Sequence, residues 1–258
     1  MNGIAVLMYH GIEDENNPSG AKDSGEKIYV LDVKTFNEQM RFLYENGFES
    51  LLLSDHKKGS DKSIVITFDD GHVSNFTLAL PILQKYGFRA EIFVTSGWIG
   101  KENYLNKSQL KELAGVGMRI GSHSITHPFL DDLSEKEIEQ ELGGSKKALE
   151  QIIQASVRGF SAPGGRVSTK VVQIAKKVGY EYVCTSRIGI FRKNLTMFNI
   201  PRIALKQTTT FEDFKKVVTQ DQVYFLKKEM VNSSLFLAKK ILGNRVYVNL
   251  RGKLLGEM

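Results

Sequence analysis

The sequence predicts an α/β fold, in which short strands alternate with helices. Apolar runs rich in β-branched residues recur along roughly the first two hundred residues, and helical patterns separate most of them. About seven such alternations fit into this chain of 258 residues, which is long enough to bury a substantial core. Periodicity does not distinguish a closed barrel from an open, doubly wound sheet. Both architectures place their chemistry at the carboxyl ends of the strands.

The strongest strand signal is Ser63–Phe68, whose last five residues are all β-branched or aromatic. Similar short runs predict the remaining strands at Ile4–Tyr9, Glu49–Leu53, Glu91–Thr95, Met118–Gly121, Arg158–Phe160, Glu181–Cys184 and Ile200–Leu205. No internal repeat interrupts this series, so we expect one (β/α) unit over residues 1–210.

Helices are predicted between these strands from their capping residues and apolar faces. Asp32 is a suitable N-cap for a helix over Val33–Asn46, and the pair Ser134 and Glu137 forms a capping box ahead of a long helix. The other predicted helices are Phe76–Tyr86, Gln109–Ala114 and Thr169–Val178. Pro81 lies inside the first of these, so that helix is expected to start later or to be kinked.

The composition is typical of a globular protein, with 41% hydrophobic and 25% charged residues. Cys184 is the single cysteine, which excludes an internal disulfide and fits a reducing compartment. The N-terminus has neither a basic region nor an apolar run long enough for a signal peptide, and no stretch is long enough to span a bilayer. The sequence therefore predicts a cytoplasmic protein.

Residues 211–258 are expected to form a basic, helical C-terminal extension. Its segment Gln222–Met258 has seven Lys or Arg and two Glu, a net charge of +5 out of +6 for the whole chain. The amphipathic run Leu235–Leu242 predicts peripheral contact with a membrane, where each Lys or Arg contributes about 1 kcal/mol near anionic lipid. The alternative is a helix that packs back on the main fold. The tail lacks interleaved aromatic residues, so no nucleic-acid partner is expected.

Polar residues with metal-binding chemistry follow two of the predicted strands. Asp69 and Asp70 come directly after Ser63–Phe68, and adjacent carboxylates repel each other unless a cation lies between them. His123 and His127 follow Met118–Gly121, and Pro128 favours a loop over a helix there. Alone, these are an ordinary turn and two loop histidines. Together, one carboxylate and two imidazoles form the three-ligand set of a catalytic zinc, and the spare carboxylate is free to act as a base.

Two further segments lie at the same end of the predicted strands. Pro163, Gly164 and Gly165 follow the strand that ends at Phe160, and such a loop can turn backbone N–H groups toward an oxyanion. The alternative is a plain connection between strand and helix. His10 follows the first strand and opens on the same face in any barrel, although a structural histidine is the alternative.

These residues resemble those of the polysaccharide deacetylases, which share the NodB-homology domain and form carbohydrate esterase family four. The shared pattern is Thr67–Gly71, then His123 and His127, then Phe160–Gly165. The resemblance implies a distorted (β/α) barrel of about seven strands that holds zinc or a similar divalent metal ion. It also implies the removal of an N-acetyl group from an amino sugar in an N-acetylated glycan.

By position, the resemblance assigns Asp69 as the catalytic base and Asp70, His123 and His127 as metal ligands. It assigns the oxyanion donor to Gly164, next to Pro163. The family's motif usually has an Arg that orients the base and a Tyr near the oxyanion, where this chain has Ser161 and Gly164. Arg166 and Arg202 are the candidates to replace that Arg, and we also expect Arg202 near the substrate.

The family's general acid is a histidine late in the domain, but no histidine follows His127 here. The run Leu7-Met8-Tyr9-His10 resembles that strand and histidine moved to the front of the chain, an order known in deacetylases of poly-N-acetylglucosamine. On this interpretation His10 is the general acid. The family's fourth motif, with an Asp and a Trp, has no clear match, since Trp98 is the only tryptophan.

Two other functions are compatible with the sequence. The missing Arg and Tyr suggest a sugar-binding pseudoenzyme, and the absence of a signal peptide suggests a deacylase for a lipid-linked or nucleotide-linked sugar. The sequence does not specify the sugar, the acyl group or the oligomeric state.

Overall fold

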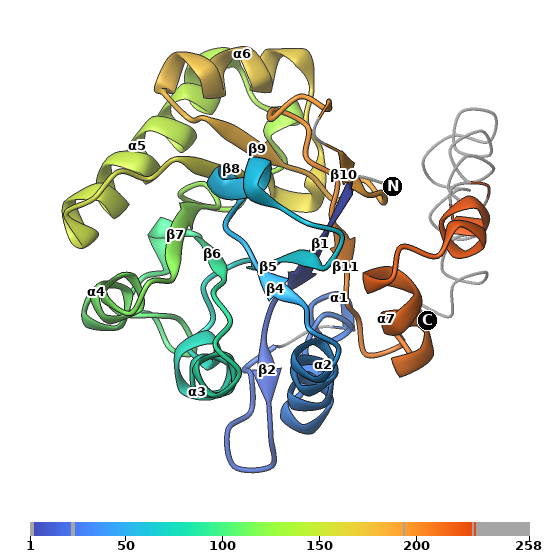
Figure 1. Ribbon diagram of the computed structural model, residues 1–258. Coiled ribbons are helices and arrows are strands. Elements are labelled where there is room, and N and C mark those ends of the chain that lie inside the picture. The colour runs from blue at the N-terminus through green and yellow to red at the C-terminus, as the bar shows by residue number, and fades with distance from the viewer. Residues whose placement is uncertain (1–2, 22–23, 193, 229, 231–258) are drawn as a thin grey trace.

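The computed structural model of the protein describes residues 3–21, 24–192, 194–228 and 230 (Figure 1). The strands are β1 Gly3–Tyr9, β2 Ile12–Glu13, β3 Leu31–Asp32, β4 Glu49–Ser50, β5 Ser63–Phe68, β6 Glu91–Val94, β7 Arg119–Ser122, β8 Gly159–Ser161, β9 Tyr182–Cys184, β10 Phe191–Arg192 and β11 Ile203–Ala204. The α-helices are α1 Ser24–Lys27, α2 Val33–Glu45, α3 Leu80–Lys85, α4 Lys107–Gly115, α5 Glu135–Ile153, α6 Thr169–Val178 and α7 Phe211–Val218.

The main sheet follows the strand order β10-β1-β5-β6-β7-β8-β9; strands β1 and β5 to β9 are parallel to one another, whereas β10 pairs with β1 in the antiparallel sense. The segment 200–204 closes the gap between the two ends of this series. Ile200 forms a parallel bridge to Cys184 in β9, and Ile203 in β11 pairs with Leu7 in β1. The predicted α/β fold and its barrel-like closure with about seven strands are therefore confirmed.

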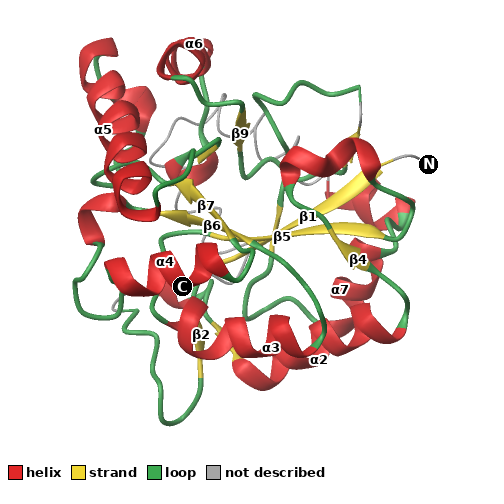
Figure 2. Cartoon of the chain, turned by 60° about the vertical axis from the view of Figure 1, so that its left-hand side comes forward, coloured by secondary structure: helices red, strands yellow, loops and turns green. Residues whose placement is uncertain are grey.

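Alternation along the strands divides the core into two parts. Ile4 and Val6 of β1 belong to a cluster inside the barrel, whereas Ala5, Leu7 and Tyr9 belong to the cluster between the sheet and its helices. Successive side chains of a strand point to opposite faces, which explains this division. Helices α2 and α3 lie outside the barrel at one side of the molecule, and α5 and α6 lie outside it at the opposite side (Figure 2).

The helix caps predicted from the sequence are confirmed. The Asp32 side chain accepts a hydrogen bond from the backbone N–H of Lys34 at the start of α2. Ser134 and Glu137 form the reciprocal capping box of α5. Each cap satisfies N–H groups that the first turn of a helix leaves without an internal partner, so each fixes where its helix begins.

Three elements differ from the sequence prediction, and one of them, the strand expected at Ile200–Leu205, is only the two residues of β11. The strand expected at Glu49–Leu53 is only the two residues of β4, and a 3₁₀ turn starts at Leu53. The helix expected at Phe76–Tyr86 begins as a π-helix over Asn75–Ala79 and becomes α3 only at Leu80. Pro81 has no N–H to donate, and its ring crowds the carbonyl one turn earlier, so proline fits only in the first turn of an α-helix. The π-helix, which has a wider turn, therefore ends at Ala79, and α3 begins at Leu80, directly before Pro81.

The first helix of the expected C-terminal extension packs on the barrel. Phe214 and Val217 of α7 are buried in the core outside the sheet, and Phe42 of α2 lies edge-on to Phe214 at 6.2 Å between ring centroids. The basic run Leu235–Leu242 lies outside the described residues. Among the described helices, none has the length and apolar character needed to cross a membrane.

Candidate active site

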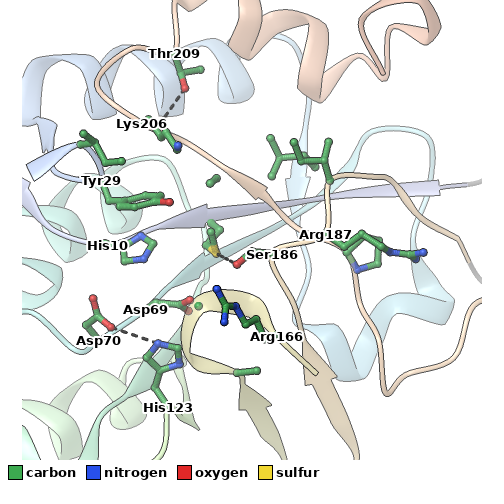
Figure 3. A pocket seen from close by; sticks show the side chains of 18 of the residues that line it. His10, Tyr29, Asp69, Asp70, His123, Arg166, Ser186, Arg187, Lys206 and Thr209 are labelled. Carbon is green, nitrogen blue, oxygen red and sulfur yellow. Dashed lines mark hydrogen bonds and ion pairs between the residues drawn. The ribbon is translucent and has the colours of Figure 1, made fainter. Parts of the chain in front are cut away.

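The polar segments singled out by the sequence meet at the carboxyl ends of the parallel strands. Asp69 and Asp70 follow β5, His123 follows β7, Gly164 follows β8 and His10 follows β1, and all five line one cavity of about 1330 Å³ (Figure 3). His10 and Asp69 are neighbours because β1 pairs with β5, and the backbone N–H of Asp69 donates to the carbonyl of Tyr9 at 2.9 Å. The fold therefore brings all four segments together.

Three potential metal ligands face one another in this cavity. Asp70 Oδ1 lies 3.3 Å from His123 Nε2 and 3.5 Å from His127 Nε2. Asp70 Oδ1 is buried and accepts no hydrogen bond from the described residues. Two ligand atoms about 2.05 Å from a zinc ion lie about 3.3 Å apart at a tetrahedral angle. These residues therefore fit a divalent metal by donor type, by spacing and by the buried oxygen that lacks a donor.

A hydrogen bond on the side of the ring away from Asp70 fixes the orientation of the His123 imidazole. Its Nδ1 lies 2.8 Å from the backbone carbonyl oxygen of Ser161, which only accepts, so Nδ1 carries the proton and donates. That tautomer leaves the Nε2 lone pair directed toward Asp70, as ligating histidines require. The strand β8, which ends at Ser161, thus fixes a ligand that comes from β7.

The loop that carries His127 is held by hydrogen bonds to a neighbouring helix. Glu141 of α5 accepts from the backbone N–H groups of Ile125 and Thr126 at 2.7 and 2.9 Å. The N–H of His127 donates to the Ser124 hydroxyl at 3.0 Å. The loop expected from Pro128 is therefore present, and its position depends on α5.

The backbone is strained at Asp70 and His127, two of the candidate metal ligands, and at Ser124, which follows the third. Asp70, Ser124 and His127 have φ angles of 73°, 68° and 65°, in the left-handed region that residues other than glycine seldom adopt. The backbone N–H of Thr95 donates to the Asp70 carbonyl at 3.2 Å and helps to hold that conformation. Strain of this kind concentrates where the surrounding structure aims particular side chains at a site.

The Asp70 carboxyl is held in its ionised form. Burial on its own would raise the pKa of this carboxyl, but interactions with His123 and His72 outweigh burial and hold the pKa well below its ordinary value. An ionised carboxylate is the form that binds a metal ion.

Asp69 is buried and forms a two-pronged ion pair with Arg202. The guanidinium donates from its two terminal nitrogens to Oδ1 and Oδ2 of Asp69, at 2.8 and 2.7 Å. Burial would raise the pKa of Asp69, but the positive charge of Arg202 outweighs it and the pKa lies below its ordinary value. Asp69 is therefore an ionised carboxylate that points into the cavity beside the proposed metal ligands.

Arg202 was expected near the substrate, and that expectation is wrong. Its side chain is 0% exposed and does not line the cavity. It lies behind Asp69 because the closing segment 200–204 places it inside the barrel, where its Nε also donates to the carbonyl of Thr185 at 3.0 Å. Of the two arginines considered as partners of the base, Arg202 contacts Asp69, whereas Arg166 stacks over the ring of Phe129 at 4.5 Å.

Ser161 stands where the family usually has the arginine, and it links the ion pair to the strand. Its hydroxyl donates to Asp69 Oδ2 at 3.1 Å and accepts from Arg202 at 2.7 Å. A serine leaves room for a guanidinium that arrives from another strand, so the smaller residue and the relocated arginine are complementary.

The glycine that replaces the family's tyrosine has an equally specific setting. Gly164 has φ 64°, and a Cβ atom placed there would lie 2.4 Å from the Phe129 ring. Phe129, which is 47% exposed at the cavity wall, therefore occupies the space that a side chain at position 164 would need. Pro163 is buried directly before this glycine in a 3₁₀ turn.

His10 is half-buried and lines the cavity next to Asp69, because β1 and β5 pair side by side. Its ring packs on Tyr29 at 4.6 Å between centroids, and its Nδ1 is buried without a hydrogen-bond partner among the described residues. Burial lowers the pKa of His10 despite the opposing charges of Asp70 and Asp69. His10 thus lines the cavity beside the candidate metal site with a ring nitrogen that has no hydrogen-bond partner among the described residues.

Sequence reasoning did not assign a role to two residues that the structure places at the site. His72 Nε2 lies 3.6 Å from Asp70 Oδ2, the oxygen that does not face the two ligand histidines. Glu141 holds the His127 loop. His72 was signalled by its place directly after Asp-Asp-Gly, whereas Glu141 is one of several glutamates on α5 and has no sequence signal of its own.

Comparisons with known proteins agree with this geometry. The family model for polysaccharide deacetylases matches residues 56–183. The chain is 32% identical over 207 residues to "Putative polysaccharide deacetylase YxkH" of Bacillus subtilis (strain 168), a match that covers 78% of this chain and 70% of that protein. It is 26% identical over 231 residues to poly-beta-1,6-N-acetyl-D-glucosamine N-deacetylase of Staphylococcus aureus (strain MSSA476), covering 79% of each.

A solved structure shares the fold. The crystal structure of BC0361, a polysaccharide deacetylase from Bacillus cereus, matches with a TM-score of 0.74 and 30% identity, covering 84% of this chain and 69% of that one. Fold and site together define a barrel hydrolase with a candidate divalent-metal centre. The chain belongs to the polysaccharide deacetylase family, and it is a deacetylase of the hydrolase class.

Proposed function

We propose that the protein removes the acetyl group from the nitrogen of an amino sugar in a glycan, with a divalent metal held by Asp70, His123 and His127. The observation that carries this proposal is that two adjacent carboxylates, Asp69 and Asp70, have different partners. Asp70 faces two imidazole nitrogens at 3.3 and 3.5 Å, while Asp69 is ionised by a different partner and remains available to the substrate.

Asp69 is proposed as the general base. It takes the proton of the water that attacks the acyl carbonyl, and Arg202 keeps it ionised and correctly turned for that transfer. A divalent ion at the site would activate the water and polarise the acyl carbonyl as a Lewis acid. The nitrogen and oxygen ligands with an open position favour zinc as that ion.

The backbone N–H of Gly164 is proposed to donate to the developing oxyanion, next to the turn that Pro163 starts. Gly164 lines the cavity, and its left-handed conformation turns the peptide toward the site. His10 is proposed to give a proton to the departing amine, which is too basic to leave unprotonated. Its position at the cavity wall beside Asp69 supports that role.

A catalytically impaired sugar-binding protein is less well supported. The motivation for it was the missing arginine and tyrosine of the third motif. Arg202 provides a guanidinium at 2.7 and 2.8 Å from the proposed base, and Phe129 fills the space beside Gly164. Both gaps are therefore filled from other parts of the chain.

The test combines metal analysis with acetate release from a panel of N-acetylated glycans. The purified protein is expected to contain about one divalent ion per chain, and His123→Ala should lose both that ion and turnover. His56→Ala is the matched control, because His56 is also a buried histidine but does not line the cavity. A His123→Ala protein that keeps a stoichiometric ion would contradict the ligand set.

The role of His10 requires its own variant. His10→Ala is expected to keep the metal and to lower turnover about a hundredfold to ten-thousandfold, the usual contribution of a general acid. The readout is kcat for acetate release together with metal content. Full turnover with the metal bound would show that the proton comes from another group.

We also propose that the protein is cytoplasmic and that its C-terminal part contacts an anionic membrane. Val223, Leu226 and Met230 are 60%, 59% and 72% exposed at a spacing that places them on one helical face, and Lys227 and Lys228 lie beside them. Co-sedimentation with phosphatidylglycerol vesicles tests this. Binding should fall in Leu226→Glu and with added salt, and binding unchanged by both would contradict the proposal.

A further inference from the structure

The loop that joins β6 to α4 is hydrogen-bonded to both of the loops that carry candidate metal ligands. Strand β6 lies between β5 and β7 in the sheet, so this loop follows the strand between the one before Asp70 and the one before His127. On one side, the backbone N–H of Thr95 donates to the Asp70 carbonyl at 3.2 Å. On the other side, the N–H of Gly97 donates to the Ile125 carbonyl at 2.9 Å. The backbone of this loop therefore links the two ligand-bearing loops.

Three aromatic side chains continue this link beside the metal ligands. They are His72, Trp98 and Tyr104, here called the aromatic brace, and all three line the cavity. The His72 ring stacks on Tyr104 at 5.3 Å between centroids, and the Tyr104 ring lies 4.8 Å from that of Trp98. Trp98 in turn stacks on His127 at 5.4 Å, with 29° between the ring planes. Centroid separations of about 4.5–7 Å are typical of attractive aromatic pairs, so the rings form one continuous series from His72 to His127.

The other end of the aromatic brace faces Asp70, at the end of the cavity where Asp70 and His123 face each other (Figure 3). His72 Nε2 lies 3.6 Å from Asp70 Oδ2, whereas Oδ1 faces the two ligand imidazoles. His72 is 8% exposed, and a backbone bridge to Tyr104 holds it in place. A group that interacts with Oδ2 sets how the carboxylate is turned, and it thereby keeps Oδ1 directed at the metal position.

His127 needs such support more than His123 does. His123 is 2% exposed, and its Nδ1 is held by the Ser161 carbonyl at 2.8 Å. The side chain of His127 is 32% exposed, and its ring has no such carbonyl partner in another described residue. Its backbone also has a φ angle of 65°. The stack on Trp98 therefore takes the orienting part that the Ser161 carbonyl has for His123.

We propose that Trp98 and His72 are positioning residues, which hold His127 and Asp70 in the arrangement that binds the metal ion and thereby set the affinity for it. The inference rests on the metal centre of the proposed function and adds the residues that support it. Partners behind metal ligands usually change metal affinity by about tenfold to a hundredfold when they are substituted. The loss of a brace residue should therefore weaken metal binding.

The first experiment measures zinc affinity by competition with a chromophoric chelator, on protein from which metal has been removed. Trp98→Leu keeps an apolar side chain without the ring and should bind zinc about tenfold more weakly or worse. Trp98→Phe keeps a ring and should recover most of that affinity. Tyr104→Leu removes the middle ring and should weaken zinc binding in the same direction. Zinc affinities of Trp98→Leu and Tyr104→Leu equal to that of the unaltered protein would overturn the inference.

His72→Phe tests the other end of the aromatic brace. The variant keeps a ring to stack on Tyr104 but lacks the nitrogen that faces Asp70 Oδ2. Its zinc affinity should fall by about tenfold or more. An affinity equal to that of the unaltered protein would refute the role of His72.

Cobalt(II) in place of zinc reports the ligand geometry, because its visible absorption depends on the number and arrangement of its ligands. At saturating cobalt, the spectrum of Trp98→Leu should differ from that of the unaltered protein, and Trp98→Phe should restore it. A variant that is merely less stable would melt earlier but would show the original spectrum once loaded. An unchanged spectrum in Trp98→Leu would therefore count against a positioning role.

Tyr86→Leu is the matched control for the loss of an aromatic ring. Tyr86 is half-buried like Trp98 and pairs with Tyr44 at 5.6 Å between centroids, but it does not line the cavity. Zinc affinity and the cobalt spectrum should stay unchanged in this variant. Should Tyr86→Leu weaken zinc binding as much as Trp98→Leu does, the effect would come from a general loss of packing and the inference would fail.

Two measurements separate this inference from the proposed function. His123→Ala should lose zinc whatever the aromatic brace does, so zinc lost in His123→Ala but retained at full affinity in the brace variants would overturn the inference alone. Conversely, a protein that binds zinc with the expected dependence on Trp98 but releases acetate from no glycan would overturn the deacetylase activity and support the aromatic brace.

Discussion

Asp69 and Glu91 are two carboxylates inside the same barrel, on the neighbouring strands β5 and β6. Asp69 is 3% exposed at the carboxyl end, and Glu91 is 0% exposed at the amino end, level with Thr67 across the strand pair. Burial raises the pKa of both. Arg202 reverses that effect at Asp69, whereas at Glu91 the hydrogen bonds from Tyr182 and from the backbone of Leu53 only oppose it, and the pKa stays raised.

The comparison teaches that the partner, rather than the depth of burial, decides the charge of a buried carboxyl. A guanidinium holds Asp69 ionised, which is the form that the proposed general base requires. The Tyr182 phenol and the Leu53 backbone N–H donate to Glu91, which does not line the cavity and acts as a structural acceptor. Substitutions at each carboxyl and at its partner test this contrast.

The largest expected effect comes from Asp69→Asn. The amide cannot accept the proton, so turnover should fall by about a thousandfold to ten-thousandfold while the metal stays bound. Acetate release and elemental analysis on the same sample measure both quantities. Turnover within tenfold of the unaltered protein would show that another group acts as the base.

Arg202→Met should have the next largest effect, on stability. The variant leaves Asp69 buried without its charged partner, and breaking a buried pair in this way costs about 3–5 kcal/mol. Chemical denaturation measures the free energy of unfolding. In the double variant Asp69→Asn/Arg202→Met the loss should be smaller than the sum of the two single losses, because no lone charge remains. Additive losses would argue against the pairing.

Tyr182→Phe removes the phenol that donates to Glu91 Oε2 at 2.7 Å. One hydrogen bond to a buried carboxyl is lost, so we expect a loss of about 1–3 kcal/mol and unchanged metal content. Denaturation and metal analysis provide the readouts. A loss as large as that of Arg202→Met would mean that Glu91 is held as a charge.

Glu91→Gln should have the smallest effect, and that effect should depend on pH. A carboxyl whose pKa is raised by folding contributes stability below its unfolded pKa and loses that contribution as pH rises through the folded pKa. The unaltered protein should therefore lose stability relative to Glu91→Gln from about pH 4.5 upward. Unfolding free energies measured from pH 4 to pH 8 test this, and parallel pH curves would exclude a raised pKa.

Local patterns sufficed for most of the fold. The strand β5 and the helix α6 occur at the residues predicted, because β-branched runs and capped amphipathic segments carry their structure in short stretches of sequence. The candidate metal ligands were also predictable from the sequence, since Asp70, His123 and His127 follow strands whose carboxyl ends must meet in a parallel sheet.

What the sequence did not reveal depends on contacts between distant residues. Arg202 is 133 positions from Asp69, and only the closing segment between β9 and β1 brings its guanidinium into the barrel. Glu141 holds the His127 loop from another helix, and no local pattern marks it. The π-helix before Pro81 depends on how the wider turn packs, which proline alone does not determine.

The segment 200–204 pairs with β1 and β9 and so forms the seam of the barrel, which brings the two ends of the folded domain together beside the candidate active site. Strand β1 brings His10 from the start of the chain, and the segment that completes the ring brings Arg202 from its far side. A chain whose seam has opened by local fraying thus leaves Asp69, the proposed base, without its guanidinium partner. Activity should accordingly be lost at a lower temperature than the one at which the whole barrel unfolds. Activity would then report whether the pairing between β11 and β1 is intact.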